Sequence, residues 1–270
     1  MNIRSEQVSI GGDQLFVHLE KGPGNRPCIV FLHDSLGSVA LWRDFPQQLA
    51  AATGCDVLVY DRRGYGRSEA FGAGERTTSY LEQEADKLAQ LLGHFGIDDA
   101  LLFGHSDGGS IALIAAAKYP ARIRGVVAEA AHIFVEEETL AGIRAAVSSY
   151  RDTDLRARLT RYHGEKTDVV FRAWTETWLR ADFRSWNIWH FLPLITCPVL
   201  VIQGTGDEYG TEAQVQGIAS GVSGPVEIRL LPGTGHTPHR EARDETLAAA
   251  AVFIRWAAGK SEPLAVSGSQ

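Results

Sequence analysis

Three side chains that are far apart in the chain could together perform nucleophilic catalysis. Ser106 lies in the G-x-S-x-G pattern GHSDG (104–108), Asp207 follows the run VIQGTG, and His236 follows LLPGTG. A serine hydroxyl is a weak nucleophile at neutral pH, so it needs a general base and a group that orients this base. We predict that Ser106 is the nucleophile, His236 the base and Asp207 the orienting carboxylate.

Each of these residues also has a simpler explanation. A G-x-S-x-G pattern occurs by chance, and a serine at a helix start can serve as an N-cap. Asp207 could form a turn, and His236 could lie in a surface loop. Glu208 and His239 compete for the acid and base roles, but His239 fits better as a supporting residue beside Glu241. The order Ser, Asp, His at three strand ends favours the catalytic interpretation.

Composition and charge exclude several other functions. The 270 residues are 44% hydrophobic and 22% charged, enough for one large core or two modest ones. A formal net charge of −7 without a block of lysines or arginines speaks against nucleic-acid binding. The three cysteines lack CxxC spacing, which indicates a reducing compartment. Without a signal peptide or a stretch of about 20 apolar residues, we expect a cytoplasmic protein that binds no membrane.

Neither a metal nor a cofactor is expected. His236 and His239 could form a metal-binding pair, but the sequence offers no third ligand at a suitable spacing, and zinc sites normally have at least three protein ligands. Hydrolysis by a serine, a histidine and an aspartate needs no cofactor. The expected partner is a small-molecule substrate.

Short apolar runs alternate with helical stretches, which predicts an α/β protein with a mostly parallel sheet and helices on both faces. Strands are expected at 27–33, 55–61, 99–104, 124–130, 198–204 and 226–232. Helices are expected at 40–52, 80–95, 106–119, 212–220 and 241–256. Two alternating runs around Gly11 and Gly12 predict an N-terminal hairpin.

The alternation stops between residues 134 and 194, which predicts an inserted helical cap. The core is then one discontinuous domain, 1–133 and 195–258, and a flexible tail follows at 259–270.

The cap is rich in aromatic residues. Phe171, Trp174 and Trp178 share one helix face. Such aromatic side chains commonly fix a cap to its core, but a cap this small cannot hide all of them. We therefore predict that Trp174 and Trp178 line a substrate cavity beneath the cap.

These motifs resemble the α/β-hydrolase superfamily from Gln7 to Trp256. The matching segments are FLHDSLGS (31–38), YDRRGYGRS (60–68), GHSDGG (104–109), GTGD (204–207) and GTGHTPHRE (233–241). Within the superfamily, the segment GHSDGGSIALIAAAKYP is most similar to the biphenyl-hydrolase-like, valacyclovir-hydrolase group. The resemblance implies an α/β-hydrolase fold with an inserted cap and a nucleophile elbow at Ser106.

The resemblance also implies an oxyanion hole, in which backbone N–H groups stabilise the tetrahedral intermediate. One donor should be the N–H of Asp107 and the other the N–H of Ser35. This chain has Asp34 after His33, where the family usually has glycine. Asp34 is therefore expected to adopt a backbone geometry that is normally reserved for glycine.

Asp107 has two explanations. A carboxylate in the first turn of a helix stabilises it by about 0.3 to 1 kcal/mol through the helix dipole. By resemblance to the valacyclovir-hydrolase group, Asp107 instead binds the ammonium group of an α-amino ester, and Asp34 adds to the negative potential.

We therefore expect a serine hydrolase that cleaves a small carboxylic ester, with α-amino esters as one candidate class, or a related acyl bond. The substrate should carry an apolar or aromatic part. Two other interpretations stay open: a carbon–carbon bond hydrolase or lactonase of aromatic-compound degradation, and a non-catalytic ligand receptor on a hydrolase scaffold. The carbon–carbon hydrolases should prefer a cationic residue for the carboxylate of their substrate, which mildly disfavours them.

Overall fold

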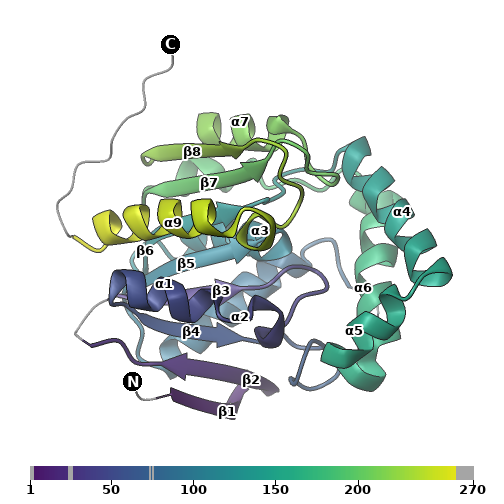
Figure 1. Ribbon diagram of the computed structural model, residues 1–270, viewed down its shortest axis with the longest axis horizontal. Helices are drawn as coiled ribbons and strands as arrows, with labels where there is room; N and C mark the ends of the chain where they lie inside the picture. Colours follow the sequence, from purple (N-terminus) through teal and green to yellow (C-terminus); the bar gives the residue numbers. More distant parts are fainter. Residues whose placement is uncertain (1–2, 24–26, 73, 75, 260–270) are drawn as a thin grey trace.

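A central sheet with helices on both faces forms the body of the protein (Figure 1). The computed structural model describes residues 3–23, 27–72, 74 and 76–259. Its eight strands have the order β1-β2-β4-β3-β5-β6-β7-β8. The strands from β3 to β8 run parallel to one another, while β1 and β2 are antiparallel to their neighbours. The predicted α/β class with a mostly parallel sheet is confirmed.

The described chain forms the following elements. The strands are β1 (Ile3–Ile10), β2 (Asp13–Glu20), β3 (Cys28–Leu32), β4 (Asp56–Tyr60), β5 (Ala100–His105), β6 (Ile123–Glu129), β7 (Val199–Gly204) and β8 (Val226–Leu231). The α-helices are α1 (Phe45–Thr53), α2 (Tyr80–His94), α3 (Asp107–Lys118), α4 (Glu137–Asp152), α5 (Leu155–His163), α6 (Thr167–Leu179), α7 (Glu212–Gly221), α8 (Pro238–Glu241) and α9 (Arg243–Ala257). The 3₁₀ helices are η1 (Val39–Trp42), η2 (Gly164–Lys166), η3 (Ala181–Phe183) and η4 (Leu192–Leu194).

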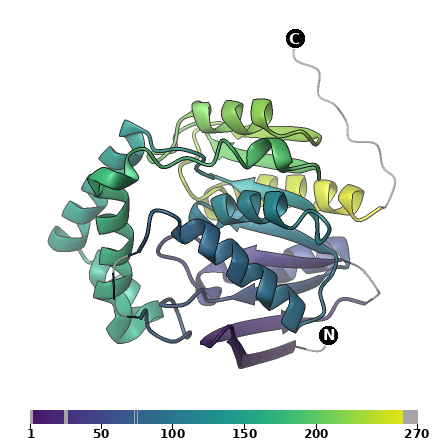
Figure 2. The same cartoon turned by 180° about the vertical axis from the view of Figure 1, so that it is seen from behind.

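The continuous apolarity of the inner strands follows from burial on both faces. Along β3, Ile29 and Phe31 pack into the core layer beneath α1 and α9, which lie on one face (Figure 1). Val30 and Leu32 alternate with them and pack beneath α2 and α3, on the other face (Figure 2). All four side chains are fully buried. A strand with two apolar faces therefore shows no polar alternation.

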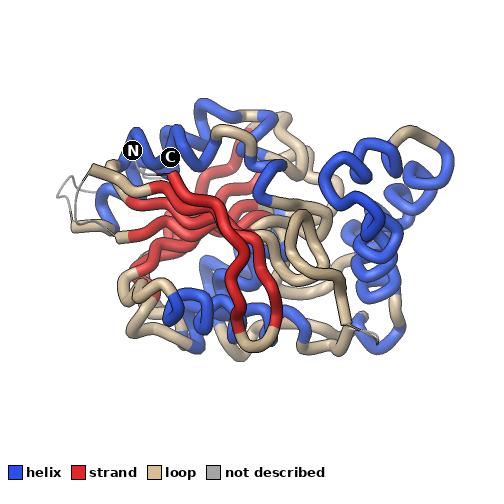
Figure 3. The backbone as a smooth tube through the Cα atoms, turned by 90° about the horizontal axis from the view of Figure 1, so that it is seen from below, coloured by secondary structure: helices blue, strands red, loops and turns tan. Residues whose placement is uncertain are grey.

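The N-terminal hairpin forms one edge of the sheet (Figure 3). Gly11 and Gly12 join β1 to β2 and both have positive φ, 56° and 89°. The register pairs Ile10 with Asp13, so the turn contains two residues. Positive φ at both turn positions matches the twist of the paired strands and favours glycine. The predicted hairpin is confirmed.

Two of the expected helices are each divided in the structure. The stretch 40–52 becomes η1 and α1 because Arg43 has a φ of 54°, and the stretch 241–256 becomes α8 and α9 with a break at Ala242. The short helices beside these breaks pack against each other, since the ring of Trp42 in η1 lies 4.5 Å from the ring of His239 in α8. Arg43 and Ala242 are neither proline nor glycine, so residue type did not mark these breaks and the sequence pattern predicted single helices.

A group of helices lies beyond the carboxyl ends of the parallel strands (Figures 1 and 2). This group, hereafter the cap, comprises α4, α5 and α6 with η2 and η3, and it lies in the connection from β6 to β7. The same connection ends with η4, which packs against α3 and α7 of the body. One isolated bridge joins Phe134 to Asn187 in this connection. Of the tail predicted at 259–270, only Gly259 belongs to the described residues. Within the described ranges, no helix combines the length and apolarity needed to cross a bilayer.

Candidate active site

Ser106 occupies a tight turn between β5 and α3. Its backbone has φ 55° and ψ −120°, a conformation that costs an L-residue about 1 to 3 kcal/mol. Two glycines make this turn possible. A Cβ atom at Gly104 would lie 2.2 Å from the carbonyl oxygen of Gly108, and one at Gly108 would lie 2.0 Å from that of Leu32. The sequence pattern therefore has glycine on both sides for a steric reason.

The structure brings Ser106, His236 and Asp207 into one hydrogen-bonded chain. Oγ of Ser106 lies 3.0 Å from Nε2 of His236, and Nδ1 of His236 lies 2.8 and 2.9 Å from the carboxylate oxygens of Asp207. Because Nδ1–H donates to the carboxylate, Nε2 presents its lone pair to the serine hydroxyl. Asp207 also accepts hydrogen bonds from Nε2 of Gln203 (2.6 Å) and from the Tyr209 N–H (2.8 Å).

The electrostatics of the pair favour proton uptake by His236. Burial opposes ionisation of Asp207, but the hydrogen bond and charge of His236 outweigh it, so the pKa of Asp207 is lowered. Burial likewise opposes the charged form of His236, yet the hydrogen bond and charge of Asp207 raise the pKa of this imidazole. The imidazolium that forms on proton uptake is therefore stabilised.

The amides of Ser35 and Asp107 belong to residues that line the same cavity as Ser106. The Asp107 N–H is one of the amides that the first turn of α3 leaves without an intrahelical acceptor. Neither this amide nor that of Ser35 has a hydrogen-bond acceptor among the described residues. Both are free to donate to a ligand oxygen.

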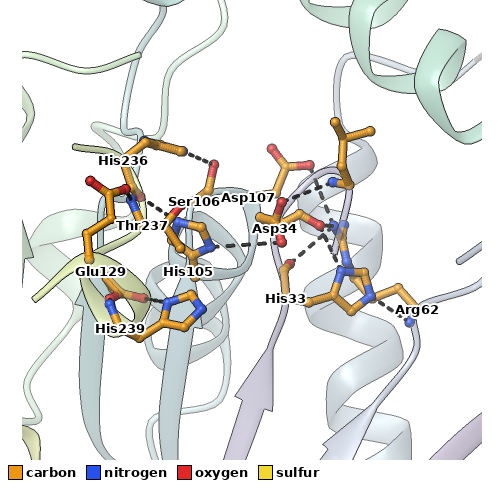
Figure 4. Close-up of polar contacts among 12 residues, drawn as sticks. His33, Asp34, Arg62, His105, Ser106, Asp107, Glu129, His236, Thr237 and His239 are labelled. Atoms are coloured by element: carbon orange, nitrogen blue, oxygen red, sulfur yellow. Dashed lines mark hydrogen bonds and ion pairs between the residues drawn. The ribbon is translucent and has the colours of Figure 1, made fainter. Parts of the chain in front are cut away.

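Arg62 holds the loop that carries Ser35 (Figure 4). Its buried guanidinium donates through Nη2 to the carbonyl oxygens of Asp34 (2.8 Å) and His33 (3.3 Å). Its backbone N–H donates to Nε2 of His33 (3.0 Å). Burial and the charge of Arg62 hold the pKa of His33 well below its usual range. Because the peptide bond is trans and planar, the Ser35 N–H points away from Arg62.

The cap contacts the same loop through His163, which is buried. Nε2 of His163 lies 2.9 Å from the carbonyl oxygen of Leu36, 127 positions away, and its Nδ1 accepts the N–H of Gly66 at 3.0 Å. Only a neutral imidazole with its proton on Nε2 satisfies both contacts. His163 therefore joins α5 to two loops of the core.

The prediction that Asp34 adopts a glycine-like backbone is wrong. Among the described residues, the non-glycine residues with positive φ are Arg43, Ser106 and Ala130. The loop instead makes a steric demand at Gly37, where a Cβ atom would lie 2.1 Å from Oδ1 of Asp34. Oδ2 of Asp34 accepts the N–H of Leu36 at 3.2 Å, so the aspartate stabilises its own turn.

Asp107 is 1% exposed, which a role in the helix dipole alone does not require. Its Oδ2 accepts a hydrogen bond from the hydroxyl of Tyr80 (2.9 Å) and lies 3.7 Å from Nη2 of Arg62. Its Oδ1 is buried and has no hydrogen-bond partner among the described residues. A buried carboxylate oxygen without a partner is costly unless a ligand binds it.

A cavity of about 210 Å³ lies above Ser106. Trp174 and Trp178 of α6 line it from the cap, as the sequence predicted. Its acidic lining residues are Asp34, Asp107 and Glu208, and the described residues that line it include no lysine or arginine, although Arg62 lies behind Asp107. The cavity therefore suits a small ligand that carries positive charge and an apolar part.

The comparisons with known proteins agree with this geometry. The model of the Alpha/beta hydrolase family matches residues 29–250. This chain belongs to the alpha/beta hydrolase family. "Serine hydrolase BPHL" of Homo sapiens is 30% identical to this hydrolase over 255 residues, which cover 90% of this chain and 84% of the relative.

Two solved structures share the fold of this hydrolase. The 2-hydroxy-6-oxo-6-phenylhexa-2,4-dienoate hydrolase (BphD) from Rhodococcus sp. strain RHA1 has a TM-score of 0.81 at 18% identity, covering 94% of this chain and 99% of that chain. The enol-lactonase from Burkholderia xenovorans LB400 has a TM-score of 0.72 at 22% identity, covering 92% and 99%.

His239 does not form the metal-binding pair with His236 that the sequence analysis considered. Its Nδ1 lies 2.7 Å from Oε2 of Glu129, while Nε2 of His105 lies 2.7 Å from the carbonyl oxygen of His236 (Figure 4). Potential ligand atoms of His105, Glu129 and His239 lie within 4.8 Å of one another, so the structure offers the third candidate that the sequence did not reveal. Each of these side chains already has a protein partner, and in this hydrolase they support the loop of His236.

The competitor Glu208 lies in the cavity lining, but no hydrogen bond joins it to His236 within the described chain. Asp207 holds that position instead. The sequence analysis did not identify Arg62 or His163 as site residues. In the hydrolase, both side chains contact backbone atoms of a loop that is distant in the sequence. Every residue has such backbone atoms, so these contacts cannot be predicted from residue type. For Arg62, the only available signal was its place in the family motif YDRRGYGRS.

Proposed function

We propose that this chain is a serine hydrolase that cleaves small carboxylic esters, with α-amino esters as the preferred class. The observation that carries the proposal is the chain of contacts from Ser106 Oγ through His236 to Asp207. The similarity to a relative named as a serine hydrolase supports it.

In the first half of the reaction, His236 Nε2 takes the proton of the Ser106 hydroxyl while Oγ attacks the ester carbonyl carbon. The N–H groups of Ser35 and Asp107 stabilise the oxyanion, a term worth about 3 to 4 kcal/mol for each donor. His236 then gives its proton to the leaving alcohol, and the acyl group stays on Oγ.

In the second half, water replaces the alcohol. His236 takes a proton from the water, whose oxygen attacks the acyl carbon, and then returns it to Oγ as the carboxylic acid leaves. Asp207 keeps its charge throughout and fixes the orientation of the imidazole. These steps use side chains, backbone amides and water alone.

The cavity supports the preference for a cationic acyl group. Oδ1 of Asp107 has no hydrogen-bond partner among the described residues, which leaves it for an ammonium group, while Arg62 and Tyr80 contact Oδ2. Asp34 and Glu208 add negative charge, so an anionic substrate is disfavoured. The same charge disfavours carbon–carbon hydrolysis of carboxylate substrates. Trp174 and Trp178 provide an aromatic wall for an apolar substrate part.

Pre-steady-state hydrolysis of a p-nitrophenyl α-amino ester tests the proposal. We expect a burst of nitrophenol that equals the enzyme concentration when deacylation is slow, and loss of turnover in Ser106→Ala. A receptor on a hydrolase scaffold would give no turnover in the native protein. A panel of esters, lactones and ring-cleavage products then separates ester hydrolysis from the competing reactions.

A further inference from the structure

His132 is a buried histidine in the cavity whose side chain lacks a hydrogen-bond partner among the described residues. It follows β6, is 3% exposed and lines the same cavity as Ser106 and Asp107. Its backbone is fixed, since Ser110 Oγ donates to its carbonyl oxygen at 2.6 Å and lies 3.3 Å from its N–H. Neither ring nitrogen has a hydrogen-bond partner within the described chain, and Nδ1 is fully buried. Such an imidazole is costly without a ligand.

The ring lies between the catalytic base and the groups that hold Asp107. It stacks on the His236 ring with centroids 5.8 Å apart and meets the Trp178 ring at 5.3 Å. Nε1 of Trp178 donates to the hydroxyl of Tyr80 at 2.9 Å, and this hydroxyl donates to Oδ2 of Asp107 at 2.9 Å. Trp178 therefore contacts His132 directly and is linked through Tyr80 to the carboxylate of Asp107.

The imidazole of His132 is neutral near pH 7. Burial and the neighbouring His236 lower the pKa of His132 to about 4, although the carboxylates of Asp207 and Asp107 act in the opposite direction. A neutral imidazole has one N–H donor and one lone pair, whereas a charged one would repel a cation. A cationic ligand can therefore approach this side chain.

We propose that His132 and Asp107 together bind the ammonium group of the substrate. Oδ1 of Asp107 accepts one N–H of this group, and the lone pair on Nε2 of His132, the ring nitrogen that is not fully buried, accepts a second. The inference rests on the proposed function and makes its substrate class narrower. It explains why a carboxylate oxygen and an imidazole, both buried and both without partners, line one cavity.

Two acceptors require at least two N–H donors on one nitrogen. A primary ammonium has three N–H groups and can satisfy both acceptors, with one N–H left over. An N,N-dimethylated ammonium has a single N–H and leaves one acceptor unpaired, and a trimethylated one leaves both unpaired. The site should therefore prefer a substrate with a primary ammonium over one with an N-alkylated ammonium of the same charge.

The test measures kcat/KM for three p-nitrophenyl esters with the same acyl skeleton: the α-amino ester, its N,N-dimethyl derivative and its des-amino analogue. In His132→Phe we expect the preference for the amino ester over the des-amino ester to fall about ten- to a hundredfold. The preference for the amino ester over the dimethyl ester should fall with it. His132→Gln, which keeps an acceptor, should retain part of both preferences.

The controls separate this inference from the proposed function. His94→Phe, an exposed substitution at the end of α2, should leave both preferences at the native value. If Asp107→Asn abolishes the preference for the amino ester but His132→Phe leaves it intact, the role of His132 is overturned and the proposed function stands. If Asp107→Asn leaves the preference intact, the role of Asp107 is overturned. If the native protein does not prefer the amino ester over the des-amino ester, the proposed substrate class itself fails.

A binding measurement covers the case in which His132→Phe does not fold. Calorimetric titration of Ser106→Ala and of Ser106→Ala with His132→Leu, which has no acceptor, uses the amide of the same amino acid as the probe. The proposal is supported if the double variant binds the primary amide more weakly than Ser106→Ala does, while both proteins bind the N,N-dimethyl amide equally. Equal binding of the primary amide by both proteins overturns it.

Discussion

Nε2 of His236 lies 3.0 Å from Oγ of Ser106, although 130 positions separate the two residues in the sequence. The serine follows β5 and the histidine follows β8, and β6 and β7 lie between these strands in the sheet. Parallel strands end at the same edge of a sheet, so loops from distant segments meet there. The short distance allows the hydroxyl proton to pass directly to the imidazole.

Replacement of Asp207 by asparagine should lower kcat by about 10³- to 10⁴-fold, because the amide no longer fixes the reactive tautomer of His236. In this variant, the acid limb of the pH profile of kcat/KM should also shift. His236 must be unprotonated to act as a base, and its pKa is raised above 6.5, so native activity falls as the pH drops through that raised value. Without the carboxylate the limb shifts to lower pH. The measurement is a pH profile of p-nitrophenyl ester hydrolysis.

Asp98→Asn serves as the control for this profile, since the Asp98 side chain is 79% exposed. Its profile should match that of the native protein. An unchanged acid limb in Asp207→Asn would contradict the assigned contact between the two side chains.

Gly108→Ala should destabilise the protein by more than about 2 kcal/mol, because the new methyl group would lie 2.0 Å from the carbonyl oxygen of Leu32. Gly93→Ala is the matched control within α2. Its methyl group would meet only the flexible end of Arg122, at 3.3 Å, and should stabilise the helix by up to about 1 kcal/mol. Urea unfolding of both variants measures the difference, and equal stabilities would argue against the steric account of the turn.

Arg62→Lys should lower kcat by about ten- to a hundredfold with a smaller change in KM, because the oxyanion donors act mainly in the transition state. A lysine keeps the charge but lacks the planar guanidinium whose Nη2 donates to the carbonyls of both His33 and Asp34. Steady-state kinetics test this expectation, with Arg63→Lys as the neighbouring, 39% exposed control. A native kcat in Arg62→Lys would show that the loop needs no support from the guanidinium.

Acid should destabilise the native protein partly through His132. In the unfolded chain this side chain binds a proton below pH 6.5, whereas in the folded chain it does so only near pH 4. The unfolded state therefore binds more protons between these values, and the free energy of unfolding decreases as the pH falls through this window. Between pH 7 and pH 5 the loss from His132 amounts to about 2 kcal/mol.

Urea unfolding at pH 7 and pH 5 measures this loss. His132→Phe cannot take up the proton, so the decrease between the two pH values should be smaller by that amount than in the native protein. The same decrease in both proteins would contradict the neutral state of the buried imidazole.

The sequence predicted the features that depend on local chemistry. The strands were visible because burial on both faces leaves no polar alternation, as in β3 and β7. The meeting of Ser106, Asp207 and His236 followed from topology, since each residue comes after the carboxyl end of a strand. Trp174 and Trp178 were identified from their shared helix face.

The features that were missed depend on contacts that residue type does not encode. Arg62 and His163 bind backbone carbonyls, and His132 is notable only because it is buried without a partner. Asp34 does not have the backbone geometry expected of it, and the loop instead needs a glycine at position 37, where the Asp34 side chain leaves no room for a Cβ atom. The breaks at Arg43 and Ala242 arise where packing overrides helical periodicity.

The most direct test of the central claim is to map the adduct formed with a fluorophosphonate. Peptide mass spectrometry should find one phosphonylated residue, Ser106, and the rate of labelling should fall strongly in His236→Ala because Oγ then lacks its base. An adduct on another residue, or an undiminished rate in His236→Ala, would contradict the account.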